Sequence, residues 1–290
     1  MKKTKILFLI ALAVFLCAPE GFSFYAYLES GIVKEGGLVK IRIGNRKKIR
    51  AADVKFMGKK YPAFLSGYDR REYEYVYLAM LPVPIGSSGR ENIVIRYMLG
   101  DKSEHIQRER VLIKKLKREI THLDTGGQMS KRMLNILGKE NRVIYGAQKE
   151  LSPIMYELPF IRPLKGKGTR ESTPFGTTRI YDNGAATWMH KGIDIAAPKG
   201  SKIKASNSGK VAVSMGGDGH GNTVVINHGG GIFSFYYHMS KRYVKKGQKV
   251  KKGDVIGAVG STGLSTGPHL HWQINVFKVP VNPVELLTGF

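Results

Sequence analysis

The sequence predicts an all-β protein with an amino-terminal β-sandwich-like domain, a linker with a short helix, and a carboxy-terminal antiparallel β domain. Glycine is abundant, with 35 residues and no collagen-like period, and 14 tyrosines and 12 phenylalanines favour strands joined by tight turns. Apolar and polar residues alternate in several segments bounded by Gly or Pro. A chain of 290 residues is long enough for two domains with their own cores.

Residues 1–23 have the pattern of a secretory signal peptide. Three lysines precede an apolar run over 6–16, and Gly21 and Ser23 place small residues at positions −3 and −1 for cleavage after Ser23. This run is short for a transmembrane helix, so an uncleaved inner-membrane anchor is the alternative. Cys17 follows a leucine, whereas a lipidation box has a small residue there. We expect an exported protein of the periplasm or cell envelope.

Charge and cysteine content narrow the classes of partner and metal site. The formal net charge is +25, with 26 Lys and Arg against 14 Asp and Glu over 24–150, and 18 against 7 over 151–290. An evenly basic surface suits a polyanionic neighbour such as cell wall or lipid headgroups, and export disfavours nucleic acid. Peripheral membrane contact and envelope regulatory proteins are further candidate partners. Cys17 is the only cysteine, so a metal site must use His, Asp or Glu.

Residues 24–120 are predicted to form the accessory β-sandwich-like domain. Period-two alternation over 38–43, 73–78 and 92–97 indicates half-buried strands of an antiparallel sandwich. No residue of this region suggests catalysis.

Residues 121–160 are predicted to be a linker with a short helix. We interpret this helix as docking on one of the domains, with an independent partner-binding helix as the alternative. Its apolar residues recur at three- and four-residue steps: Met129, Met133, Ile136, Leu137, Val143, Ile144 and Ala147.

Residues 161–290 are predicted to form the second β domain. Apolar runs bounded by Gly or Asn occupy 209–213, 222–226, 231–237 and 254–259, and no long helical pattern interrupts them. Residues 244–254 look like the hairpin of biotinyl and lipoyl carrier domains. Their many lysines do not single out one acylation site, and export separates the chain from cytosolic ligases.

Six of the eight histidines lie after residue 189. Side chains alternate faces along a strand, so His269 and His271 would point the same way, roughly 7 Å apart. A straight strand would separate His190 from Asp194 by roughly 13 Å, too far for one ion. The backbone must therefore turn between them, and Gly192 is the residue that permits it.

These segments resemble the M23 family of zinc metallopeptidases, of the LytM or lysostaphin type. The resemblance covers about 160–290, and implies a LytM-type fold related to the biotinyl/lipoyl-like hybrid motif. The matching segments are Phe175-Gly176 to Arg179, His190 to Pro198, Tyr236 to Ser240, and Gly260 to His271.

The resemblance implies that His190, Asp194 and His271 hold one zinc ion per chain, while His238 and His269 are catalytic. Three such ligands leave one tetrahedral position open, as catalytic zinc requires. Zinc would activate a water by lowering its pKa from about 15.7 towards 7. The two further histidines would accept its proton, stabilise the oxyanion or protonate the leaving amine.

Two further residues are candidate substrate contacts. Arg179 would bind a substrate carboxylate, with an internal salt bridge as the alternative. His220 lies in a glycine-rich stretch that would border the groove.

The resulting hypothesis is a zinc-dependent endopeptidase that hydrolyses the peptide cross-links of bacterial peptidoglycan, with D,D-endopeptidase activity. The alternative is a non-catalytic LytM-like regulator that activates cell-wall amidases. A non-haem iron or cupin enzyme fits less well, because neither the carboxylate spacing of an iron triad nor a Glu shortly after His271 is present.

Overall fold

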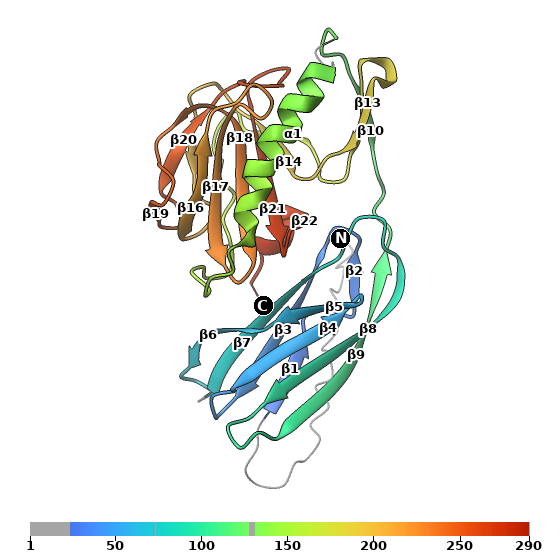
Figure 1. Cartoon of the computed structure of the whole chain (residues 1–290), viewed down its shortest axis with the longest axis vertical. Helices are drawn as coiled ribbons and strands as arrows, with labels where there is room; N and C mark the ends of the chain where they lie inside the picture. Colours follow the sequence, from blue (N-terminus) through green and yellow to red (C-terminus); the bar gives the residue numbers. More distant parts are fainter. Residues whose placement is uncertain (1–23, 73, 128–130, 290) are drawn as a thin grey trace, which may run out of the picture.

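The computed structural model describes residues 24–72, 74–127 and 131–289 (Figure 1). Strands dominate this part of the chain and one α helix occurs in it, so the predicted all-β fold class is confirmed. The predicted signal peptide, residues 1–23, and Met129 of the predicted helical stripe lie outside the described residues.

The amino-terminal domain is a β-sandwich. Its two sheets enclose a buried core in which Ile41 and Leu81 of one sheet face Phe56 and Ile95 of the other. Alternation of apolar and polar residues produces this arrangement, because successive side chains of a strand point to opposite faces. One sheet has the order β1 (Phe24–Leu28), β3 (Leu38–Asn45), β7 (Glu74–Pro82), β6 (Phe64–Asp69), and the other β2 (Ile32–Lys34), β9 (Glu104–Lys114), β8 (Gly89–Met98), β4 (Ala51–Phe56), β5 (Lys59–Pro62).

The carboxy-terminal domain is built on a ten-stranded antiparallel sheet. Trp272, Tyr236 and Ile226 lie in its buried core. Its main path is β11 (Arg170–Thr173), β14 (Ile193–Ala196), β21 (His269–Val276), β18 (Ile232–Arg242), β17 (Asn222–Gly229), β16 (Gly209–Met215), β19 (Lys249–Val250). Off this path, β15 (Lys202–Lys204) pairs with β20 (Val255–Val259), β20 also pairs with β18, and β22 (Val279–Val281) pairs with β21. The neighbouring strands β21 and β18 carry His269, His271 and His238, and β14 carries Asp194.

The linker packs on the carboxy-terminal domain. The helix α1 (Lys131–Gly146) lies across the face of the large sheet in Figure 1, and its Ile144 packs with Val225 and Phe235. The preceding strand β10 (Ile120–Leu123) pairs in parallel with β12 (Thr178–Tyr181), which pairs with β13 (Ala186–Met189). Three short 3-10 helices complete the described elements: η1 (Ala147–Lys149), η2 (Asp182–Gly184) and η3 (Pro283–Leu286).

The two domains also contact each other directly. The backbone N–H of Asn282 donates to the Gly36 carbonyl at 2.7 Å, and the Lys40 ammonium donates to the Thr288 hydroxyl at 3.1 Å. The rings of Tyr61 and Phe277 meet edge to face, with centroids 5.2 Å apart.

A search for membrane-spanning helices among the described residues finds none that is long and apolar enough.

Candidate metal centre

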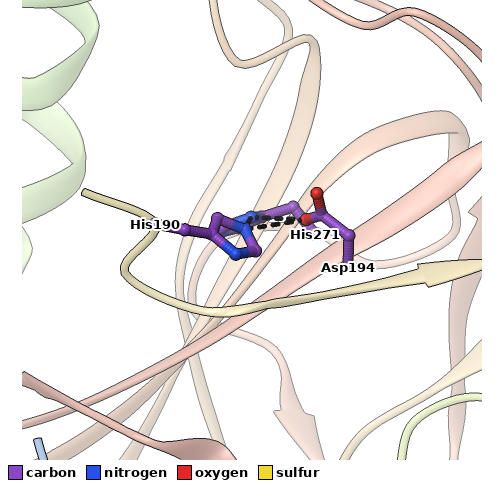
Figure 2. Close-up of side chains that lie close together, drawn as sticks. All are labelled: His190, Asp194 and His271. Carbon is purple, nitrogen blue, oxygen red and sulfur yellow. Dashed lines mark hydrogen bonds and ion pairs between the residues drawn. The ribbon is translucent and has the colours of Figure 1, made fainter. Parts of the chain in front are cut away.

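His190, Asp194 and His271 converge in the carboxy-terminal domain (Figure 2). Asp194 of β14 lies directly opposite His271 of β21 in the antiparallel register, so the two side chains share one face. His190 lies just before β14. The His190 Nε2 atom is 3.0 Å from Asp194 Oδ1 and 2.9 Å from His271 Nδ1, and the latter two are 2.9 Å apart. All three residues are buried.

Gly192 lies at the turn between His190 and β14, as predicted. However, the turn does not need glycine for its backbone freedom. Its φ is not in the left-handed region that favours glycine. A Cβ at this position would lie 2.4 Å from the Trp272 carbonyl oxygen and 2.8 Å from His271 Nε2. Only a residue without a side chain allows the chain to pass this close to β21, which brings His190 to Asp194.

The chemistry of these atoms fits a divalent cation. His190 Nδ1 donates to the Pro174 carbonyl at 2.9 Å, so Nε2 of the neutral ring presents a lone pair. That lone pair faces a carboxylate oxygen and a second imidazole nitrogen, and a proton or a metal must lie between them. Zinc bonds of about 2.0–2.1 Å place tetrahedral ligand atoms roughly 3.3 Å apart, close to the observed separations. The carbonyl bond that orients His190 is typical of metal-ligating histidines.

The surroundings of Asp194 and His271 favour the protonation states in which these side chains can bind a metal: an ionised carboxylate and a neutral imidazole. Burial favours the neutral form of Asp194, but hydrogen bonds and charges from His190 and His271 outweigh it and hold the carboxyl pKa well below its usual range. Burial, which outweighs the effect of Asp194, lowers the pKa of His271 to about 4. At neutral pH the cluster is therefore a carboxylate beside an uncharged His271.

His238 and His269 lie beside the cluster with their rings 4.8 Å apart. His238 Nδ1 donates to the Thr262 carbonyl at 2.9 Å, and His269 Nδ1 to the Gly267 carbonyl at 2.8 Å. In the neutral tautomer that these bonds select, Nε2 carries no proton, and the Nε2 of His269 is 3.9 Å from Asp194 Oδ2. Burial, followed by charge repulsion from His269, lowers the pKa of His238 to about 3. At neutral pH His238 is therefore uncharged.

Arg179 and His220 occupy different positions around the cluster. The Arg179 guanidinium of β12 forms an ion pair with Asp194, which is the internal salt bridge considered as its alternative role, and it also lines the adjacent cavity. His220 packs against Tyr237 and contacts Asn141, and it is absent from the cavity lining. The predicted substrate contact of His220 receives no support from this position.

An open cavity of about 340 Å³ adjoins the cluster. Asp194, His238 and His269 line it together with the loop from Leu264 to Pro268. Its walls also include residues that the sequence did not single out: Leu123 and Thr125 of the linker, and Arg170, Ser172 and Thr173 of β11. Pairing of β10 with β12 and of β11 with β14 brings them there. The candidate catalytic histidines therefore lie in the wall of an open groove.

Comparison with known proteins connects this geometry to a family. The model of peptidase family M23 matches residues 188–283, which include all three candidate ligands and both further histidines. Residues 188–283 thus match an M23 domain, and we call the carboxy-terminal domain that contains them the M23 domain. The predicted family resemblance is thereby confirmed.

Curated relatives match the M23 domain region. Over 119 residues, the chain is 44% identical to the DD-carboxypeptidase/endopeptidase Mpg of Neisseria meningitidis serogroup B, a match that covers 41% of this chain and 27% of that protein. It is 40% identical over 116 residues to the peptidoglycan DD-endopeptidase ShyA of Vibrio cholerae serotype O1, covering 40% of this chain and 27% of that protein. The matches thus span about a quarter of each relative's length.

The similarity in structure extends beyond the M23 domain. A crystal structure of a Pseudomonas aeruginosa protein assigned to peptidase M23 aligns with a TM-score of 0.63 and 26% identity. The alignment covers 88% of this chain and 95% of that one, so it includes much of the amino-terminal domain and the linker.

Proposed function

We propose that this chain is a zinc-dependent endopeptidase that hydrolyses the peptide cross-links of bacterial peptidoglycan. The observation that carries the proposal is the convergence of His190, Asp194 and His271 beside a groove lined by two further histidines. The cluster has three members among the described residues, which fits the open coordination of a catalytic site better than a closed structural one. Two imidazoles and a carboxylate are also a donor set that zinc accepts readily.

Different residues of the chain would assist different steps of peptide hydrolysis. Bound zinc would supply a Lewis acid that polarises a carbonyl and makes a water more acidic. His238 and His269 present unprotonated Nε2 atoms to the groove, where one would accept a proton and the other would stabilise the oxyanion or protonate the leaving amine. Arg179 balances the charge of Asp194 and would contact a substrate carboxylate at the cavity wall.

The names of the relatives support D,D-endopeptidase activity. Mpg is a DD-carboxypeptidase/endopeptidase and ShyA a peptidoglycan DD-endopeptidase, and both match this chain at 40% identity or more. We therefore propose D,D cross-links as the bonds cut. The basic surface, with a net charge of +25, would favour approach to the anionic wall.

We also propose export to the periplasm or cell envelope. The signal-like pattern of residues 1–23 supports this proposal, with inner-membrane anchoring as the outcome if cleavage does not occur. Contacts with envelope regulatory proteins or with the membrane surface stay predictions of the same kind.

A digestion of isolated peptidoglycan sacculi tests the proposal. Purified protein with zinc should reduce the fraction of cross-linked muropeptides in the sacculi, and a chelator should abolish this. His271→Ala should lose both zinc and activity. His269→Ala should keep zinc yet lose activity by at least about 100-fold, the usual contribution of a general acid or base. Muropeptide chromatography and metal analysis measure the two effects, and His105→Ala, on the exposed surface of the other domain, is the matched control.

Other outcomes would contradict the proposal. Intact sacculi under all conditions, together with amidase activation by the zinc-loaded protein, would favour the regulator. Release of glycan strands without peptides would indicate amidase chemistry instead.

A further inference from the structure

Glu140 of the linker helix α1 is a buried carboxylate that holds a loop of the M23 domain. It is 8% exposed, and its two oxygens accept hydrogen bonds from the backbone N–H groups of Gly219 at 2.9 Å and His220 at 2.7 Å. No Lys or Arg pairs with it in the part of the chain that the structure describes. Burial of a carboxylate without a cation is costly, and these two charge-assisted hydrogen bonds offset that cost.

The loop of residues 216–221, here the glycine loop, is shaped to receive α1. A Cβ on Gly217 would lie 2.3 Å from the Glu140 carboxylate, and one on Gly219 would lie 2.6 Å from the Leu137 side chain. The next helix residue, Asn141, accepts a hydrogen bond from His220 Nε2 at 2.9 Å. The helix thus fixes both the backbone and the imidazole of His220.

A stack of rings leads from the glycine loop to the metal cluster. The His220 ring lies on Tyr237 with centroids 4.6 Å apart and an angle of 26° between the planes. Tyr237 in turn lies on His271, with centroids 5.2 Å apart and an angle of 12°. The orientation of a candidate zinc ligand is therefore set by a packed column that ends at α1.

The glycine loop also supports the other side of the site. The His220 carbonyl accepts from the His238 N–H at 3.1 Å, and the Gly219 carbonyl accepts from the Leu264 N–H at 2.8 Å. His238 has a φ of +61°, a left-handed conformation that a non-glycine residue adopts only where its surroundings hold it. Leu264 belongs to the cavity wall.

We propose that α1 is a functional part of the M23 site, with Glu140 and Asn141 as positioning residues that act through the glycine loop on His271 and His238. The helix lies outside residues 188–283, which the family model matches. The inference rests on the proposed function for its effect on turnover, whereas its effect on zinc binding can be measured without any substrate.

Glu140→Gln in the full chain tests the positioning role. The amide has one oxygen for two N–H donors, so the glycine loop loses one of its two hydrogen bonds to residue 140. The negative charge of Glu140 is removed as well. We expect zinc affinity to fall roughly tenfold in competition with a chelating dye, as for other residues that orient metal ligands. We also expect kcat to fall roughly tenfold with KM nearly unchanged, and amide hydrogen exchange of residues 216–221 to accelerate. Glu150→Gln, the same change at an exposed position, should match the wild type.

Gly217→Ala provides a second variant that keeps the carboxylate but pushes the glycine loop away from it. It should reproduce the loss of zinc affinity if Glu140→Gln fails to fold. Folded variants with wild-type zinc affinity and wild-type loop exchange would overturn the inference. An active wild type with unaffected variants would overturn the positioning role alone. An inert wild type with weakened zinc binding in the variants would instead overturn the hydrolase proposal and leave the positioning role supported.

Discussion

Hydrogen-bond partners separate the roles of the histidines that follow residue 189. His228 is fully buried away from the cluster, where Nδ1 donates to the Ser208 carbonyl at 2.7 Å and Nε2 lies 2.7 Å from the Ser234 hydroxyl. Both nitrogens are satisfied within the core, as expected for a packing residue. His190 and His271 instead direct nitrogen atoms at each other and at Asp194. Partner chemistry therefore distinguishes a structural histidine from a candidate ligand when burial alone does not.

Stability should depend on pH through His228. Burial lowers its pKa from 6.5 to about 4, so between these values the unfolded chain binds a proton that the folded chain does not. The free energy of unfolding should therefore fall as pH drops through this window, by up to about 1.4 kcal/mol per pH unit from this group, and should not change with its titration above it. Urea unfolding at several pH values across this window should show that the free energy of unfolding depends less steeply on pH in His228→Gln than in the wild type. Identical slopes would contradict this assignment.

At the scale of elements, the site depends on the contact between the His190–Gly192 turn and β21. Gly192→Ala should destabilise the M23 domain by about 1–3 kcal/mol, because the added methyl meets the Trp272 carbonyl and His271. It should also weaken zinc binding, since the turn carries His190. Chemical denaturation and chelator competition measure the two effects.

Gly267→Ala is the control for this variant, because no atom lies within 4 Å of the added Cβ. Equal stability of the Gly192 and Gly267 variants would show that β21 tolerates the methyl, and would contradict the close-approach explanation.

The sequence patterns predicted the elements better than the contacts between them. Period-two alternation identified β3, β7 and β8 as strands. The predicted half-burial holds for β8, whereas β3 and β7 are buried on both faces along most of their length. The histidine motifs included the three residues that converge, since antiparallel pairing puts Asp194 opposite His271. Their role as metal ligands stays a prediction. The role of Glu140 depends on packing between distant segments, although one signal was present: this acidic residue interrupts the apolar stripe formed by Leu137 and Ile144. The linker and β11 residues of the groove gave no signal, because strand pairing alone brings them there.

At the scale of the molecule, the amino-terminal domain and the M23 domain share a packed boundary. Phe277 contacts the cores of both domains, and its backbone N–H donates to the Gly231 carbonyl at 2.9 Å. The Lys40 ammonium also donates hydrogen bonds to the Thr288 hydroxyl and the Gly289 carbonyl, so this boundary couples the domains. The linker contributes residues to the wall of the groove. The groove therefore belongs to one packed assembly of the two domains and the linker.

This coupling predicts one cooperative thermal transition for the wild-type chain in calorimetry. Phe277→Ala should lower the free energy of unfolding by about 2 kcal/mol and separate the transition into two, because a half-buried ring that joins the cores is removed. Tyr243→Ala, an exposed aromatic in the M23 domain, should change stability by less than about 0.5 kcal/mol. Two well-separated transitions in the wild type would show that the domains unfold independently.

We propose that His190, Asp194 and His271 form a catalytic zinc site with one open position. Anomalous diffraction at the zinc edge, from crystals of the protein grown with zinc, is the decisive test. We predict one peak per chain, bound by His190 Nε2, Asp194 Oδ1 and His271 Nδ1, with its remaining side facing the groove. A peak at another position, or a fourth protein ligand that closes the site, would contradict the claim.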